Sequence, residues 1–290
     1  MDYRVTHRTT YRYLHEVSQS QHLLHLAPRA TAFQSVTDAL VTVTPNPVRR
    51  TQRVDYFGNT TEWLALLEPH MTLDILSESH VTVTAPPQRD PNGVLPWEDV
   101  RLMLEAPNDP VTIDAAEYLF NSPSIYFTAD LASYALKSFT PRRSTLAAAR
   151  ELMARVHKDF RYDTTVTDVA TPVDRVFQIR AGVCQDLAHV MIACLRAIGL
   201  PARYVSGYLL TLPPPGRPRL VGADASHAWL SVWCPPIGWI DFDPTNNLIP
   251  GDGHVTVAWG RDYSDVAPIN GLMVGGGDHV IEVGVDVVPQ

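Results

Sequence analysis

The sequence predicts an α+β protein in which an all-β module precedes a unit that has its helices first and an antiparallel sheet after them. Residues 3–84 alternate Thr, Val, Tyr and Leu with polar residues in short runs broken by turn residues. This pattern is typical of about six antiparallel strands forming a β-sandwich or a half-barrel. The second half has long helical stretches followed by strands, without the strand-helix alternation of doubly wound folds.

Four segments follow from changes in composition along the chain. Residues 1–85 form the β-rich N-terminal module, and 86–109 are expected to be a linker, because four prolines and a glycine fall between residues 85 and 97. The core is predicted at 110–254, and 255–290 is predicted as a C-terminal β segment that completes the fold.

Helices are expected at 110–139, at 142–158 and from Cys184 onward. The apolar residues after Cys184 recur every three or four positions, as on a helix with one buried face, and Gly199 with Pro201 ends it. Strands are expected at 203–210, 227–233, 238–242, 255–259 and 279–288, with a Pro-rich loop at 211–225.

Composition excludes several classes of protein. The chain has 290 residues, 45% of them hydrophobic and 19% charged, which is a globular balance. Its net charge of -8 leaves no basic surface suited to nucleic acid. No apolar run reaches the roughly 18 residues that a membrane span needs, and the charged start of the chain predicts a cytoplasmic protein. The sequence does not predict an oligomeric state.

The cysteines argue against a disulfide framework or a zinc site. There are three of them, an odd number, and no CxxC pair occurs. A metal site built from Cys184 and His227 would lack a third ligand at a suitable spacing. We therefore predict neither a metal nor a cofactor.

Cys184 is a candidate nucleophile because it stands at the predicted start of a helix, where unpaired N–H groups and the helix dipole favour a thiolate. Asp186 opposes this charge unless it caps the helix or is itself paired. The alternative is a buried structural cysteine, which is the better interpretation of Cys194 on the apolar stripe. His189 lies about 140° round the same helix from Cys184 and is expected to be structural.

His227 and Asp243 are the candidate base and its orienting carboxylate. If 234–238 form the hairpin loop, Trp229 opposes Asp243, and the imidazole and carboxylate are diagonal neighbours about 7 Å apart on one face. A four-residue loop would turn the carboxylate to the other face. Asp241 shares a face with Asp243 and is the alternative orienter.

Three tryptophans, Trp229, Trp233 and Trp239, stand on these same strands. Trp229 and Trp239 would most simply be core packing, because large aromatic residues at strand spacing usually are. They could instead form a wall of the pocket that holds the acyl group of a substrate. Both interpretations stay open at this point.

Four blocks in order resemble the bacterial transglutaminase-like superfamily. They are AGVCQDLAH (181–189), GLPARYVSGY (199–208), SHAW (226–229) and GWIDFDPT (238–245). The first 85 or so residues resemble the N-terminal region that precedes this core in bacterial members, and VAWGRDY (257–263) resembles their closing segment. The resemblance implies a papain-like fold with Cys184 as nucleophile, His227 as base and Asp243 as orienter.

The side chain that donates to the oxyanion in animal transglutaminases has no counterpart in this sequence. Those enzymes use a Trp upstream of the nucleophile, and no Trp occurs between Trp97 and Cys184. The backbone N–H of Cys184 could supply one donor, and Tyr162 or Gln185 a second. Acidic residues of the tail are scattered, so we predict independence from calcium.

The implied reaction is acyl transfer at a peptide or protein amide through a thioester. Water as acceptor would make the protein a cysteine protease, amidase or deamidase, and an amine would make it a transglutaminase or amide-forming transferase. Hydrolysis is favoured, because bacterial members with this resemblance are often described as cysteine proteases. A non-catalytic binding or scaffold protein with a lapsed triad is the alternative from another class.

Overall fold

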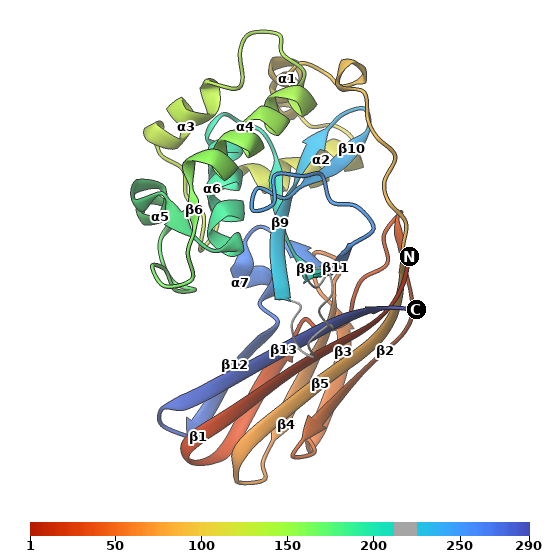
Figure 1. The fold of residues 1–290 in the computed structure, drawn as a ribbon, viewed down its shortest axis with the longest axis vertical. Helices are drawn as coiled ribbons and strands as arrows, with labels where there is room; N and C mark the ends of the chain where they lie inside the picture. Colours follow the sequence, from red (N-terminus) through yellow and green to blue (C-terminus); the bar gives the residue numbers. More distant parts are fainter. Residues whose placement is uncertain (212–224) are drawn as a thin grey trace, which may run out of the picture.

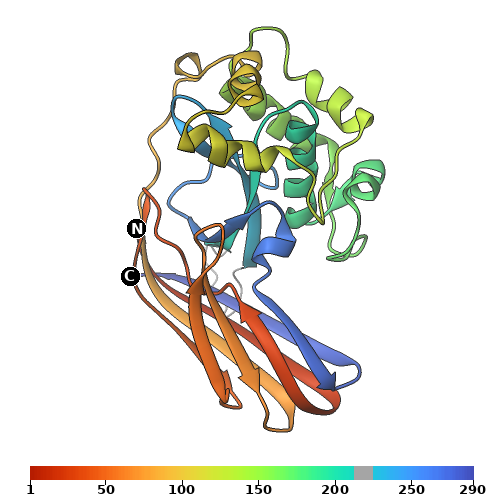
Figure 2. The same ribbon diagram turned by 180° about the vertical axis from the view of Figure 1, so that it is seen from behind.

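The computed structural model describes residues 1–211 and 225–290. A curved antiparallel sheet forms one part of the molecule, and a body of helices packed on a second sheet forms the other (Figure 1; Figure 2 from behind). This arrangement confirms the predicted α+β class, with a half-barrel as the N-terminal module. Apart from its two end residues, the predicted Pro-rich loop at 211–225 lies outside the described residues. No helix in the described ranges is long and apolar enough to cross a membrane.

The half-barrel is a seven-stranded sheet that combines the two ends of the chain. Five strands precede the helical body and two follow it, so the body is inserted between β5 and β12. The strands are β1 (Asp2–Leu24), β2 (Gln34–Thr44), β3 (Arg49–Val54), β4 (Thr60–Leu66), β5 (His70–Val83), β12 (Ile269–Gly275) and β13 (His279–Pro289).

Strand β1 is the centre of this sheet. Its first half pairs with β5 and with β13, and its second half pairs with β4 and with β12, in each case antiparallel. Alternate residues such as Tyr3, Val5, His7 and Thr9 are buried, which is the period of two that the sequence shows. The predicted C-terminal segment 255–290 is therefore divided, because only its last two strands join the half-barrel.

The helical body contains a four-stranded antiparallel sheet in the order β10-β9-β8-β11 and a short parallel pair, β6-β7. The strands are β6 (Arg161–Tyr162), β7 (Ala181–Gly182), β8 (Ala202–Leu209), β9 (Ala225–Cys234), β10 (Gly238–Phe242) and β11 (His254–Gly260). The α-helices are α1 (Trp97–Glu105), α2 (Pro110–Ala116), α3 (Ala129–Leu136), α4 (Thr145–Asp159), α5 (Val173–Ile179), α6 (Cys184–Ala197) and α7 (Tyr263–Val266), with 3-10 turns η1 (Pro91–Gly93) and η2 (Glu117–Leu119).

Two predicted segments differ from the structure. The continuous helix expected at 110–139 is interrupted after η2, where the chain carries Pro123, which cannot continue a helix. The expected linker 86–109 contains α1, whose Val100 and Leu104 are buried. Four of its five prolines precede the helix and Pro107 follows it, so the prolines mark the ends of α1 and do not interrupt it.

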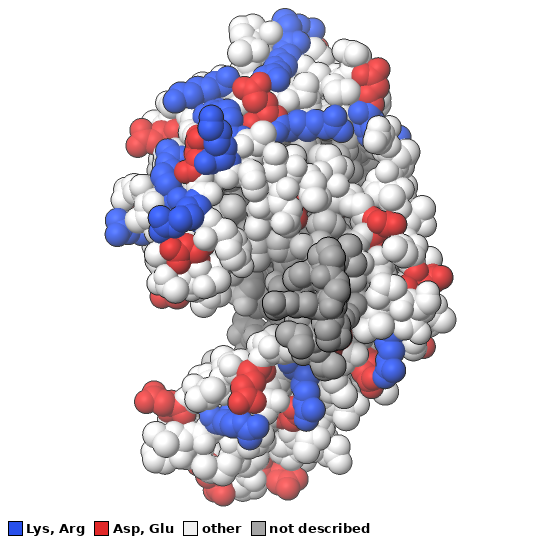
Figure 3. All heavy atoms as spheres, viewed as in Figure 1, with Lys and Arg blue, Asp and Glu red and all other residues white. Residues whose placement is uncertain are grey.

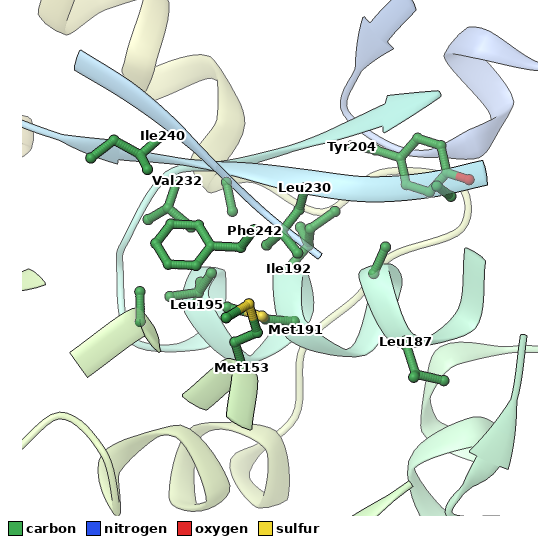
Figure 4. Close-up of a cluster of buried hydrophobic side chains, with 14 of the residues drawn as sticks. Met153, Leu187, Met191, Ile192, Leu195, Tyr204, Leu230, Val232, Ile240 and Phe242 are labelled. Carbon is green, nitrogen blue, oxygen red and sulfur yellow. The ribbon is translucent and has the colours of Figure 1, made fainter. Parts of the chain in front are cut away.

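Helix α6 packs against the four-stranded sheet through the apolar stripe that the sequence shows. Figure 4 shows Met191 and Leu195 of α6 facing Val232 of β9 and Phe242 of β10, within one cluster of buried side chains. Leu187 lies nearer the start of the helix. This packing fixes where the first residue of α6 lies relative to β9 and β10.

Surface charge is mixed on the face seen in Figure 3. Lys and Arg side chains gather over the helical body, and Asp and Glu side chains lie between them. Basic and acidic groups also alternate over the half-barrel on this face.

The half-barrel is joined to the helical body by apolar packing and by specific hydrogen bonds. Tyr3 and Val5 of β1 belong to the same buried cluster as the residues of α6. The buried Gln34 side chain donates to the carbonyl oxygens of Arg29 at 2.8 Å and Thr256 at 2.7 Å, and it accepts from the N–H of Thr256 at 2.8 Å. Gln34 therefore joins the two parts by binding both backbone groups of Thr256, as a residue of a neighbouring strand would.

We expect Gln34→Ala to destabilise the protein by about 1–3 kcal/mol, because it leaves buried backbone groups of Thr256 without their partners. Urea unfolding measures this. The control is Gln19→Ala, at an exposed position of β1, which should change the unfolding free energy by less than about 0.5 kcal/mol. Equal effects of the two substitutions would contradict the role given to Gln34.

Candidate active site

Cys184 is the first residue of α6, as predicted, and its side chain is half-buried. The parallel pair β6-β7 leads directly into this helix, so that Tyr162 lies beside Gly182. The first N–H groups of a helix have no intrahelical partner and carry the positive end of its dipole. Position and dipole together favour negative charge on the Cys184 sulfur.

Asp186 caps this helix and does not point a free carboxylate at the thiol. Its Oδ2 accepts from the N–H of Val183 at 2.8 Å and from the hydroxyl of Thr167 at 2.7 Å. Burial raises the pKa of Asp186, which further opposes a full negative charge there. A Cβ at Gly182 would lie 2.5 Å from Oδ2 of Asp186, so only glycine leaves room for the cap.

Strands β9 and β10 place His227 and Asp243 on one face. Gly238 pairs with Cys234 and Phe242 with Leu230, which is the register predicted from a 234–238 loop, although the pairing extends to both end residues of that loop. Continuing this register by one residue sets Asp243 opposite Trp229. The result is a hydrogen bond of 2.8 Å between Nε2 of His227 and Oδ2 of Asp243.

The Asp243 carboxylate is fully buried and has five donors. Its Oδ2 accepts from His227, from Nδ2 of Asn246 at 2.7 Å and from Nε2 of His254 at 3.2 Å. Its Oδ1 accepts from the N–H of Thr245 at 3.0 Å and of Asn246 at 3.1 Å. Although burial alone would raise the pKa of Asp243, these partners hold that pKa well below its usual range.

The His227 ring interacts with both the carboxylate and the thiol. Burial opposes the charged ring, but hydrogen bonds to Asp243 and to Cys184, with the charges of both, raise the pKa of His227 to about 9. Because Nε2 is engaged by Asp243, Nδ1 is the nitrogen left for the sulfur. Side chains from α6, from β9 and from the turn after β10 thus meet at one point.

Comparisons with known proteins identify the family of this chain. Residues 133–244 match the transglutaminase-like superfamily, and residues 3–82 match the bacterial transglutaminase-like N-terminal region. An uncharacterised protein of Mycobacterium tuberculosis is 41% identical over 99% of this chain and 92% of its own length. The chain belongs to the transglutaminase-like superfamily.

Other relatives extend the comparison. An uncharacterised protein of Mycobacterium leprae is 33% identical over 98% of this chain and 97% of its own length. A protein-glutamine gamma-glutamyltransferase of Pseudomonas aeruginosa is 40% identical over 99 residues, which are 32% of this chain and 14% of that protein. The crystal structure of a candidate cysteine protease from Cytophaga hutchinsonii has a TM-score of 0.76 at 23% identity, covering 100% of this chain and 91% of that one. It shows that the fold is shared.

Asp241, the alternative orienter, does not contact His227 in this transglutaminase-like chain. Its Oδ2 accepts from Nε1 of Trp229 at 2.9 Å, and its Oδ1 accepts from the hydroxyl of Ser231. The two acidic residues of this hairpin therefore hold different partners. Of these two carboxylates, Asp243 is the one bonded to the imidazole.

The two candidate oxyanion donors differ in position. Tyr162 is 55% exposed, and burial together with the charge of Cys184 raises the pKa of its phenol, which places it near the thiol. Gln185 donates from Nε2 to the carbonyl oxygen of Val169 at 3.2 Å, so one of its amide hydrogens is already engaged. The Gln185 amide is thus engaged by Val169, whereas Tyr162 lies on the strand beside Gly182.

Three further residues at this site were not predicted from the sequence. Asn246 follows Asp243 by three residues in a turn, and its side chain donates to the Asp243 carboxylate. Asn and Asp at this spacing in a turn often bond in this way, so the sequence does contain a signal for this contact. His254 comes from β11, whose pairing with β8 the sequence does not reveal. Tyr204 of β8 is buried near the thiol, and burial with the Cys184 charge raises its pKa.

His227, Asp243 and His254 bring three metal-binding side chains within 4.8 Å of one another. Their contacts of 2.8 Å and 3.2 Å are hydrogen-bond distances. Ligands at about 2.1 Å from a tetrahedral ion would lie about 3.4 Å apart. The trio therefore fits a proton-bearing network better than an ion in its centre.

The candidate pocket residues Trp229 and Trp239 lie on the wall of a cavity of about 800 Å³ between the half-barrel and the helical body. Cys184 is not among the residues that line this cavity. Trp229 is at the same time fully buried, as the core-packing interpretation expects. The cavity thus lies on the face of the sheet that carries His227 and Trp229, and Cys184 is not part of its lining.

Iodoacetamide at pH 6 should alkylate Cys184 far faster than Cys194 and Cys234. Burial raises the pKa of both other thiols, that of Cys194 to about 12. Asp243→Asn should slow labelling of Cys184 at least about tenfold, because loss of the carboxylate lowers the pKa of His227 and removes the cation beside the sulfur. Peptide mapping by mass spectrometry measures each rate.

Asp241→Asn is the matched control for this experiment. It changes the same side chain on the same hairpin but touches Trp229 and Ser231 instead of His227, so labelling of Cys184 should stay within about twofold of the wild-type rate. Equal, slow labelling of all three thiols would contradict an activated Cys184. It would favour a scaffold with a lapsed triad.

Proposed function

We propose that this protein is a cysteine enzyme that transfers the acyl group of a peptide or protein amide, with water as the usual acceptor. The observation that supports this most directly is the meeting of Cys184, His227 and Asp243 at the start of α6. A buried carboxylate that orients an imidazole beside a half-exposed thiol is the arrangement that nucleophilic catalysis needs.

The reaction begins with the Cys184 thiolate paired with the protonated His227. The sulfur attacks the amide carbonyl carbon, and the C–N bond breaks as His227 gives its proton to the leaving amine. A thioester on Cys184 remains. Neutral His227 then removes a proton from water, the resulting hydroxide attacks the thioester carbon, and the carboxylic acid leaves as the thiolate re-forms.

Negative charge on the carbonyl oxygen needs donors during both steps. The N–H of Cys184 at the start of α6 is one candidate, and the Tyr162 hydroxyl is the second. Tyr162 lies on β6, which is paired with the residues immediately before the nucleophile. Gln185 is the weaker candidate because its amide already binds Val169.

An amine acceptor is the second candidate. The relative from Pseudomonas aeruginosa, 40% identical over 99 residues, is named a protein-glutamine gamma-glutamyltransferase. The first half of the reaction is the same for either acceptor, since an amine can replace water at the thioester.

We also propose a cytoplasmic location, in keeping with three free cysteines of which two are buried.

Mass spectrometry of glutamine-containing peptides incubated with the protein tests this proposal. Cleavage or a deamidation of about +1 Da would identify a hydrolase, and incorporation of an added primary amine would identify a transferase. Cys184→Ala should abolish every product, and Cys194→Ala should abolish none. Products that persist in Cys184→Ala, or a lack of any product across a varied peptide library, would contradict the proposal.

The pH dependence of kcat/KM should show an alkaline fall near pH 9. A raised pKa keeps His227 protonated up to that pH, and above it the imidazolium that pairs with the thiolate and protonates the amine is lost. The rate should then drop about tenfold per pH unit. A fall near pH 6.5, the ordinary value for histidine, would show that Asp243 and Cys184 do not hold the ring charged.

A further inference from the structure

The cavity beside β9 and β10 has walls from both parts of the molecule. The half-barrel contributes Phe33 and the Pro86-Pro87 segment, and the helical body contributes aromatic residues of β9, β10 and β11 together with Ile249. Its volume of about 800 Å³ is that of a site for a small organic molecule. Neither Cys184 nor His227 lines it, so it lies outside the proposed reaction centre.

Arg203 of β8 is the most unusual residue of this wall. Only 8% of it is exposed, and its guanidinium stacks over Trp259 at 3.7 Å and Trp239 at 4.5 Å from the ring centroids. Within residues 1–211 and 225–290 it has no carboxylate in ion-pair contact, and its buried Nε has no hydrogen-bond partner. A buried cation that keeps an unused donor is costly unless something binds it.

Neighbouring groups satisfy this charge only in part. Tyr118 has a side-chain hydrogen bond with Arg203, but Nε is left without a partner. Asp241 attracts Arg203, but its two oxygens accept hydrogen bonds from Trp229 and Ser231. Arg150 also lines the cavity and has a buried Nε without a partner, and Arg89 is a third basic residue there. The lining thus has three arginines and one carboxylate, whose oxygens already accept other hydrogen bonds, so its net charge is positive.

We propose that this cavity binds an organic carboxylate on an apolar or aromatic body. Arginine offers parallel N–H donors that match a carboxylate, and its stacking on indoles holds the guanidinium plane in place. The tryptophans and prolines would then cover the apolar part of the ligand. The same chemistry could come from a free small acid or from the C-terminal carboxylate of a peptide.

Calorimetric titration of the full wild-type chain with 3-phenylpropionate and with 3-phenylpropionamide tests the proposal. The pair differs only in charge and donor pattern. The carboxylate should bind at least about tenfold more tightly than the amide, as expected for a charge-assisted hydrogen bond at a buried arginine. No binding of the acid, or equal affinities for the pair, would overturn the proposal.

Arg203→Met should remove this preference while keeping an unbranched, flexible side chain against the tryptophans. The control is Arg101→Met, which removes an arginine that lies over Trp97 at 5.6 Å but outside the cavity, and which should keep the preference. A preference that survives in folded Arg203→Met would overturn the assignment. If that variant fails to fold, the acid and amide pair on the wild-type protein still decides.

A second titration distinguishes the two sources of the carboxylate. The peptide Ala-Ala-Phe is compared with its C-terminal amide under the same conditions. Tighter binding of the free peptide than of 3-phenylpropionate would support a peptide terminus as occupant, and the reverse order would support a small acid. These measurements follow binding alone, so they remain valid if the proposed acyl transfer is wrong.

Discussion

The buried charge of Asp243 is the interaction on which the candidate site depends. A carboxylate without access to water is very costly unless donors surround it, and this one has five. Those donors come from β9, from β11 and from the turn that follows Asp243 itself. The charge therefore fixes the relative positions of these elements, and the orientation of His227 is one result of it.

The two acidic residues of β10 and its following turn have separate roles because of their hydrogen-bond partners. Asp243 binds two imidazoles, and Asp241 binds an indole and a hydroxyl on the side of the cavity. His254 connects the two regions, since it contacts Asp243 and also lines the cavity with its ring packed edge-on to Trp229. A change in the cavity could thus reach the imidazole through a single side chain.

Local patterns in the sequence predicted much of this site, whereas contacts between distant segments were missed. The apolar stripe after Cys184 predicted α6 and its first residue, and the length of one hairpin loop predicted the face shared by His227 and Asp243. His254 was missed because the pairing of β11 with β8 depends on packing between segments about 50 residues apart. The placement of β12 and β13 in the N-terminal sheet was missed for the same reason.

The central position of β1 also affects how the chain must fold. Its neighbours on one side, β12 and β13, lie between residues 269 and 289, so ribosomes making about 5–20 residues per second leave that edge open for many seconds. The open edge of a 23-residue strand is a template for mispairing with other chains. The half-barrel closes last although its first strand is made first, and we expect nascent chains to need chaperone protection throughout that interval.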